Sequence, residues 1–296
     1  MSQLFRNWRL ASGGAIAVAG SFCLAFGFSI LRANAGDDLQ VELRVAPAPP
    51  AAAAAPASES GRKPAAPSLD EEFAEFEERL QTEPAPQVIR NAVQTLRERP
   101  RDVRKEHLAL VHDWLKDALA AEPDSLILRM LLAELLDLEN RFDDLVKLYR
   151  ELLKDKKLVD IQRAIVNNNL AYVLSARGDE KELPEAEAAI DEAIQALGPT
   201  TDLLDTRAMV RLAKGDVKAA RADVNTAVKD RPSGALYFHL ALVEDKAGDR
   251  EATRDAMKRA VELKVDRDHI PSAERKAFDR LKGELDEKKE SSPLKE

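Results

Sequence analysis

Apolar residues recur at helical spacing over most of this chain. After a helix-start signal at Ser68, Phe73, Phe76 and Leu80 are spaced at i, i+3 and i+7, which places them on one face of a helix. Comparable stripes follow one another to about Leu285, with short polar interruptions. The pattern predicts an all-α fold.

The stripes become more regular along the chain. The helices expected before Pro123 share no common pattern, and Pro100 separates two of them, because a helix does not continue through proline. We expect an irregular pair of helices or a degenerate repeat in this part. From Leu126 onward, the stripes come in regular pairs.

A short pattern recurs within these pairs: a small residue, then a glycine seven positions later, then an aspartate. It occurs three times, with a weaker fourth copy: Ala171/Gly178/Asp179, Ala208/Gly215/Asp216, Ala241/Gly248/Asp249 and Ala133/Asn140/Arg141. Gly215 and Gly248 are 33 residues apart. Gly178 and Gly215 are 37 apart, which is close to the same period if residues 180–182 are an insertion. A fixed period of this length marks a repeat architecture.

Each position of the pattern has a physical role. Glycine tolerates the left-handed conformation that ends a helix, and asparagine is the next-best residue there. The aspartate can cap the following helix by accepting a backbone N–H, and the alanine is small where two helices approach closely. On the second helix of each pair, contact residues recur at matching distances: Leu145/Tyr149/Leu152, Ala186/Ile190/Ala193, Ala220/Val224/Ala227 and Thr253/Met257/Ala260.

With Asn168–Tyr172 followed by Ala176–Asp179, the chain resembles the tetratricopeptide repeat family. The resemblance covers about residues 126–266. It implies a right-handed α-solenoid of antiparallel helix pairs that binds peptides or protein segments in a concave groove. Asn140 in place of glycine, Thr253 in place of alanine and the insertion depart from the family pattern, so the number of repeats stays open.

The resemblance also implies which side chains line the groove. In the family, the first helix of each pair faces it, with residues about ten, six and three positions before the turn glycine pointing inward. Carried onto this chain, the candidate partner-binding residues are Met130, Glu134, Asn168, Tyr172, Asp205, Met209, Phe238, Leu242 and Asp245. Packing between adjacent hairpins is the alternative role for each of them, because groove and seam share the same helix. The basic clamp with which the family holds C-terminal carboxylates is replaced here by aspartate and apolar residues, so we do not expect that mode.

The expected groove carries negative charge. Five carboxylates on first helices are expected to face it: Glu134, Asp137, Asp202, Asp205 and Asp245. A cleft lined with one sign of charge attracts the other sign, and Met209, Phe238 and Leu242 would add apolar contact. We therefore expect a partner segment that is basic and carries large apolar residues.

The N-terminal residues are of a different kind. Leu10–Leu31 is an uncharged run of 22 residues, long enough as a helix to cross a hydrocarbon core of about 30 Å. Arg6 and Arg9 favour a cytoplasmic N-terminus, with the rest of the chain outside. The alternative is a signal peptide cleaved after Ala35, although the run exceeds the usual apolar core. In a third interpretation, small residues four apart in the run pack membrane helices together in a self-assembling structural protein.

The remaining segments complete the expected organisation. Residues 46–67 contain 16 alanines or prolines among 22 residues, which favours an extended spacer. Near the C-terminus, Ala273, Ala277, Leu281 and Leu285 make a stripe for a capping helix. The expected segments are 1–9 cytoplasmic N-terminus, 10–31 transmembrane anchor or signal segment, 32–68 linker, 69–122 irregular helices, 123–266 repeats, 267–289 capping helix and 290–296 tail.

Composition and motifs narrow the function. The net charge of −8 argues against a nucleic-acid partner. Cys23 is the only cysteine, so no intramolecular disulfide can form. His107 and His112 are five apart rather than the four that would place two ligands on one helical face, so we expect surface or partly packed histidines. No phosphate-binding loop, nucleophile elbow or Cys-x-x-Cys motif occurs.

These observations together predict a scaffold that is not an enzyme and needs no cofactor, metal or small-molecule substrate. Its partner is expected to be a protein. The expected location is the bacterial cytoplasmic membrane, crossed once, with the body facing the periplasm. A soluble periplasmic or secreted repeat protein is the alternative.

Overall fold

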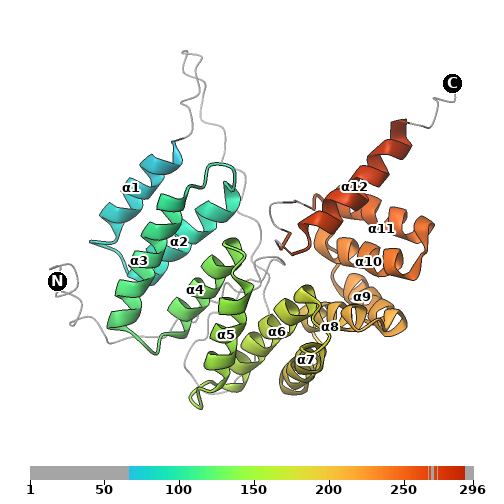
Figure 1. The fold of residues 1–296 in the computed structure, drawn as a ribbon, viewed down its shortest axis with the longest axis horizontal. Helices are drawn as coiled ribbons and strands as arrows, with labels where there is room; N and C mark the ends of the chain where they lie inside the picture. Colours follow the sequence, from blue (N-terminus) through green and yellow to red (C-terminus); the bar gives the residue numbers. More distant parts are fainter. Residues whose placement is uncertain (1–66, 266, 268–269, 272, 291–296) are drawn as a thin grey trace. The chain divides into compact units, whose positions relative to one another are not determined.

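The computed structural model describes residues 67–265, 267, 270–271 and 273–290. These residues form helices joined by turns, with no β-strand among them (Figure 1), so the predicted all-α fold is confirmed. No helix within these ranges is both long and apolar enough to cross a membrane. The predicted membrane segment, most of the linker and most of the tail lie outside the described residues.

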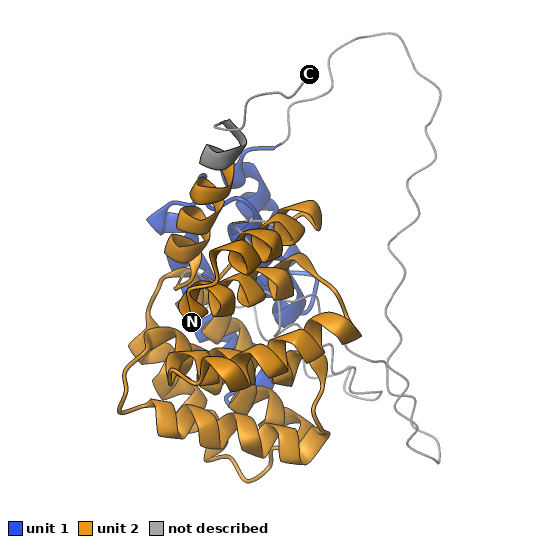
Figure 2. Cartoon of the chain, turned by 90° about the vertical axis from the view of Figure 1, so that its right-hand side faces the viewer, with its two compact units in different colours: residues 1–128 blue, residues 129–296 orange. Residues whose placement is uncertain are grey.

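The chain divides into two compact units, residues 1–128 and 129–296 (Figure 2). The described part of the first unit contains α1 (Leu69–Arg79), α2 (Ala85–Glu98) and α3 (Lys105–Ala121), and α4 (Leu126–Leu138) crosses the boundary. The second unit continues with α5 (Phe142–Leu153), α6 (Asp160–Arg177), α7 (Leu183–Leu197), α8 (Thr201–Ala213), α9 (Val217–Asp230), α10 (Gly234–Ala247), α11 (Arg250–Glu262) and α12 (Arg275–Glu290).

The first unit is built from helices whose apolar faces pack together. Ser68 starts α1 with a capping box, in which its hydroxyl accepts the Glu71 N–H and the Glu71 carboxylate accepts the Ser68 N–H at 2.7 Å. The ring of Phe73, a residue that is 2 % exposed, lies 5.8 Å from the ring of Trp114 and 4.8 Å from that of His107. Three helices, α1 to α3, occupy the region for which an irregular pair or a degenerate repeat was expected.

His107 is buried, so the expectation of a surface or partly packed side chain was wrong. The residue is 3 % exposed. Its Nδ1 accepts the backbone N–H of Arg104 at 3.2 Å, and its Nε2 lies 2.8 Å from the Asp70 carboxylate. Burial lowers the pKa of His107, which favours the neutral ring with its proton on Nε2. The contact joins α1 to α3 across 37 residues, a separation at which local periodicity carries no signal.

Helices of the second unit pair as hairpins. α6 packs against α7, α8 against α9, and α10 against α11, and each of these hairpins contacts the next. α12 follows the last hairpin and packs against α11. This is the stacked arrangement that the 33- to 37-residue period predicts.

The turns of the hairpins have the predicted backbone conformation. The φ angles of Gly178, Gly215 and Gly248 are 68°, 84° and 79°, and that of Asn140 is 57°. These angles lie in the left-handed region that favours glycine and then asparagine at a helix end. The weaker fourth copy of the pattern therefore forms the same kind of turn as the other three.

The aspartates after these glycines follow the prediction in two turns and depart from it in one. Asp216 and Asp249 cap α9 and α11, each accepting the N–H three residues ahead at 3.0 Å. Asp179 instead accepts the N–H of Lys181 at 3.0 Å, and α7 begins only at Leu183. The inserted residues form an extra turn, which moves Asp179 away from the start of the helix.

The C-terminal helix packs through the second half of the predicted stripe, Leu281 and Leu285, but not through its first half. α12 starts later than expected, and its core residues are Phe278, Leu281 and Leu285. Ala273 is exposed and Ala277 is only partly buried. Phe278 offers far more apolar area than either alanine, and burial of that area selects the face of the helix.

Candidate functional site

The candidate partner-binding residues lie on α4, α6, α8 and α10, but most of them are buried. Those less than a tenth exposed are Met130 (8 %), Glu134 (4 %), Asn168 (7 %), Asp205 (3 %), Met209 (6 %) and Phe238 (0 %). Tyr172, Leu242 and Asp245 are partly exposed. The structure therefore does not arrange the nine side chains as one open row.

Phe238 and Met209 belong to the core. The ring of Phe238 packs edge-on against that of Phe278, with centroids 5.3 Å apart. Met209 lies in a buried cluster with Val224 and Leu236. Of the two roles that the sequence left open for these side chains, packing between elements is the one found.

A buried charged network joins two successive repeats to the residue before α12. His239 on α10 is 0 % exposed. Its Nδ1 lies 2.7 Å from the Asp205 carboxylate on α8, and its Nε2 lies 3.2 Å from the carboxylate of Glu274, just before α12. The sequence separations are 34 and 35 residues, which is close to the period of the repeats. Sequence reasoning missed His239 and Glu274, although this near-repeat spacing was available as a signal.

The network is built to hold charge inside the protein. Burial by itself lowers the pKa of His239, but the charges of Asp205 and Glu274 outweigh it and raise the pKa to about 10. The ring is therefore an imidazolium at neutral pH. Burial, followed by the charge of Glu274, also raises the pKa of Tyr172. Both ring nitrogens of His239 are engaged by carboxylates, so the ring is suited to joining helices rather than to accepting a substrate proton.

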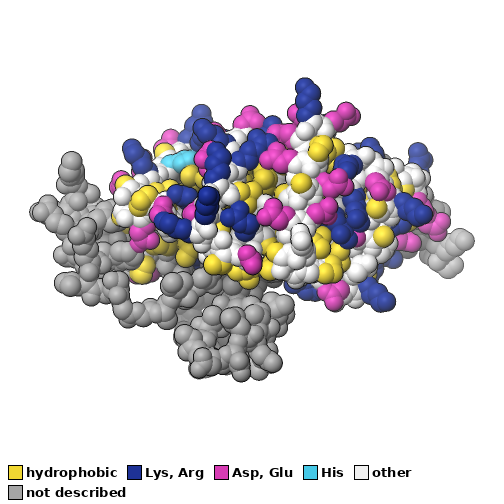
Figure 3. Space-filling model, turned by 90° about the horizontal axis from the view of Figure 1, so that it is seen from below, with side chains coloured by type: hydrophobic (Ala, Val, Ile, Leu, Met, Phe, Trp, Pro, Cys, Tyr) yellow, Lys and Arg dark blue, Asp and Glu magenta, His cyan; other side chains and the backbone are white. Residues whose placement is uncertain are grey.

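Cations of the chain balance much of the charge expected in the groove. Three of the five carboxylates are paired: Asp202 with Arg231 (2.5 Å), Asp205 with His239 (2.7 Å) and Asp245 with Arg280 (2.6 Å). Glu134 and Asp137 also interact within the chain. Burial raises the pKa of Asp202 to about 7 in spite of Arg231. On the face drawn in Figure 3, acidic and basic side chains are interspersed.

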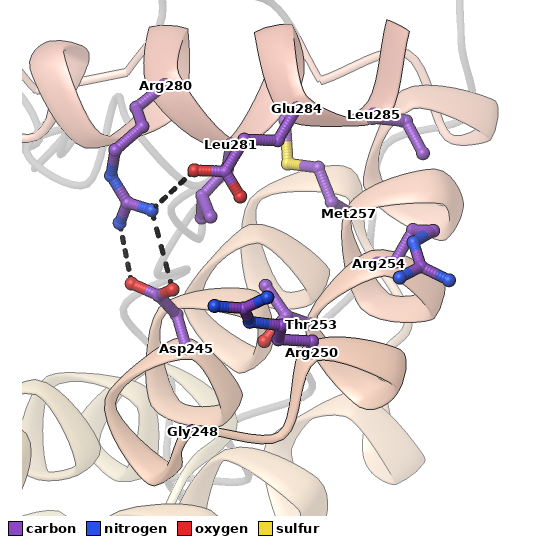
Figure 4. Close-up of a pocket in the computed structure, with 10 residues that line it drawn as sticks. All are labelled: Asp245, Gly248, Arg250, Thr253, Arg254, Met257, Arg280, Leu281, Glu284 and Leu285. Carbon is purple, nitrogen blue, oxygen red and sulfur yellow. Dashed lines mark hydrogen bonds and ion pairs between the residues drawn. The ribbon is translucent and has the colours of Figure 1, made fainter. Parts of the chain in front are cut away.

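An open cleft of about 820 Å³ lies between the α10–α11 hairpin and α12 (Figure 4). On one side, Arg280 binds Asp245 at 2.6 Å and Glu284 at 3.0 Å. Arg250 and Arg254 of α11 also line it. The apolar lining residues are Met257, Leu281 and Leu285. We call this feature the terminal cleft.

Sequence reasoning found one residue of the terminal cleft, Asp245. Met257, Leu281 and Leu285 were predicted only as packing residues. The charged residues of α11 and α12 were missed because only the first helix of each pair was expected to line a groove. The spacing of Arg250 and Arg254 by four residues, which places both on one face of a helix, is the signal that could have found them. Within the described residues, no group of three or more His, Cys, Asp or Glu side chains is placed to hold a metal ion.

Among known proteins, the chain has a structural likeness to a pilus biogenesis factor. No protein-family model matches the chain, and no curated protein matches it. The chain is similar to a crystal structure of PilW, described as a widely conserved type IV pilus biogenesis factor, with a TM-score of 0.49 and 20 % sequence identity. The match covers 71 % of this chain and 96 % of that chain. The fold described above rests on the helix pairs and repeat spacing of this chain itself.

Proposed function

We propose that this chain is a non-enzymatic scaffold that holds a segment of a partner protein against its helical repeats. The observation that carries this function is the stack of hairpins, which presents successive first helices side by side and leaves an open cleft beside the last hairpin. Stacked hairpins offer an extended surface to a partner while each unit is stabilised by its neighbours.

The surface that we propose for the partner follows the first helices. Tyr172, Leu242 and Asp245 are partly exposed and would make direct contact. The other candidate residues would form the layer beneath and set its shape: Met130, Glu134, Asn168, Asp205, Met209 and Phe238. A basic partner segment would have to compete at this surface with cations of the chain itself, because Arg231, His239 and Arg280 already hold three of its carboxylates.

We further propose that residues 10–31 tether the scaffold to a bacterial cytoplasmic membrane, with the repeats outside the cytoplasm. The uncharged length of this run and the arginines before it support this placement. A soluble protein released after Ala35 is the second candidate, favoured by the small residues at that position. Self-assembly through small residues in the same run is the third.

Site-specific crosslinking in cells tests the scaffold function. A photo-crosslinking amino acid replaces Leu242 on α10 in the full chain, and a control variant carries it at Lys218, which is exposed on α9. We expect a discrete crosslinked protein from position 242 and none, or a much weaker band, from position 218. Equal yields at the two positions, or no crosslinked protein at either, would count against partner binding by the first helices.

A further inference from the structure

Two arginines stand apart from the others in the second unit. Among the arginines that the structure describes between residues 129 and 290, all but Arg250 and Arg254 take part in an interaction within the chain. Most are held by carboxylates. Arg250 is exposed and Arg254 is half-buried, and both line the terminal cleft.

The other charges of the terminal cleft are already paired. Arg280 lies between Asp245 and Glu284 and binds both (Figure 4). Arg250 lies on the Asp245 side of the cleft, and Arg254 lies beyond Met257 on the Leu285 side. The three arginines and two carboxylates leave the lining with one net positive charge. Arg250 and Arg254 carry it, and neither has an ion-pair partner among the residues that the structure describes.

Acidic residues close to these arginines in sequence do not compensate them directly. Asp249 is occupied in capping α11, where it accepts the N–H of Ala252 at 3.0 Å. Glu251 and Asp255 each follow one of the arginines by a single residue, which rotates them about 100° around the helix. Residues one apart on a helix do not face each other. Glu251 also lies three residues before Arg254, a spacing at which helical side chains can meet, but no ion pair joins these two side chains in the described part of the chain.

We infer that the terminal cleft binds an acidic segment of the partner protein, with Arg250 and Arg254 each receiving a carboxylate. This inference rests on the proposed scaffold function. Guanidinium groups bind carboxylates through paired, charge-assisted hydrogen bonds. Apolar side chains of the same segment would contact the wall formed by Met257, Leu281 and Leu285.

Charge also argues for a peptide rather than a polyanion. The chain as a whole carries a net charge of −8, which repels nucleic acid and a strongly anionic lipid surface at long range. A short acidic segment brings few charges, and its binding depends on local pairing. The arginines on the two sides of Met257 suit carboxylates spaced along an extended chain.

Binding of labelled peptides to the detergent-solubilised full chain tests the inference. The probes are ten-residue peptides in which glutamate alternates with leucine, and matched peptides with glutamine or lysine in place of glutamate. We expect fluorescence anisotropy to show binding of the acidic peptide, at least tenfold weaker binding of the glutamine peptide, and loss of affinity as salt rises. Two results overturn the inference. One is no measurable binding of the acidic peptide up to about 1 mM, which corresponds to a binding free energy weaker than about −4 kcal/mol. The other is equal binding of the lysine peptide.

Matched variants then locate the site. Arg250→Gln combined with Arg254→Gln should weaken the acidic peptide at least tenfold. The control, Lys218→Gln combined with Lys258→Gln, removes the same charge from exposed positions that do not line the cleft and should leave the affinity within twofold. Equal loss in both pairs means a general charge effect and overturns the assignment. If crosslinking at position 242 still captures a partner from the arginine variant at the wild-type level, the scaffold function stands and the cleft assignment fails.

Discussion

At the scale of single residues, the structure buries charged side chains that the sequence placed in an open, acidic groove. Asp205 is 3 % exposed and His239 is 0 % exposed, so both ions have lost most of their water. Such burial is tolerated only when the charges are paired and hydrogen-bonded. The pair, extended by Glu274, therefore joins α8, α10 and the residue before α12 through contacts that are costly to break.

Removing the cation of this network should be severe. His239→Ala leaves Asp205 buried without its counter-charge, and breaking a buried pair in this way costs about 3–5 kcal/mol. Denaturant unfolding of the variant measures the loss. A change below about 1 kcal/mol, the size expected of an ordinary hydrogen bond, would contradict the role assigned to His239.

The same residue should make stability depend on pH. The folded protein raises the pKa of His239 from 6.5 to about 10, so the stabilisation is complete below pH 6.5 and is lost as the pH rises towards 10. Between pH 7.5 and 9.5, the melting temperature of the wild type should fall more steeply than that of His239→Gln. Asp202, with a pKa of about 7, is largely ionised in both states over this window. Parallel slopes for the two proteins would contradict the raised pKa.

At the scale of elements, the turn glycines illustrate how local chemistry sets the repeat. Gly215 has a φ of 84°, whereas Gly283 lies within α12, and a Cβ at either position would meet no atom within 4 Å. The two sites therefore differ in backbone conformation and not in available space. This difference makes them a matched pair for testing the turn.

Alanine should have opposite effects at the two glycines. Gly215→Ala is expected to cost about 1–2 kcal/mol, because the left-handed conformation brings Cβ close to the backbone. Gly283→Ala should instead stabilise by about 0.4–1 kcal/mol, because alanine has less conformational freedom to lose on folding. Thermal unfolding of the two variants measures both shifts, and shifts of the same sign would contradict the assigned turn.

The close approach of paired helices gives a second test at this scale. Ala208 and Ala241 are both 0 % exposed. Ala208→Leu or Ala241→Leu should overpack the interior and cost about 1–3 kcal/mol. Ala222→Leu, at an exposed position of α9, should stay within about 0.5 kcal/mol. Equal melting temperatures for all three variants would remove the close-packing role and with it the repeat register.

At the scale of the whole molecule, the proposed tether and the described units belong to different parts of the chain. Residues 10–31 carry the proposed anchor, and the described helices begin at α1 (Leu69–Arg79). We propose that the Ala- and Pro-rich residues 46–67 between them act as an extended spacer. This arrangement would hold the repeats away from the membrane, where a partner segment can reach them.

Membrane extraction distinguishes the anchor from its alternative. The full-length protein should stay in the membrane pellet after an alkaline carbonate wash, because a helix of 22 uncharged residues inserts through the hydrophobic core. Protease added outside the cytoplasmic membrane should remove the body. A mature chain that begins at Gly36 and fractionates as soluble would support release by signal cleavage instead.

The sequence by itself determined the helical class, the repeat period and the chemistry of the turns. The spacing of apolar residues indicates helices. The left-handed backbone conformation at the turns favours glycine or asparagine, which are found at Gly178, Gly215, Gly248 and Asn140. These features depend on residues close together in the chain, so local propensity and periodicity are sufficient to predict them.

Only the tertiary structure decided which side chains are buried and which charges are satisfied. A helical stripe identifies a face but not what packs against it, so Phe238 could be a groove residue or a core residue until Phe278 was placed beside it. The stacking of repeats pairs His239 with carboxylates 34 and 35 residues away. The same stacking leaves Arg250 and Arg254 without such a partner among the described residues. Stacking is a sum of long-range contacts, and these become visible only when the whole unit is assembled.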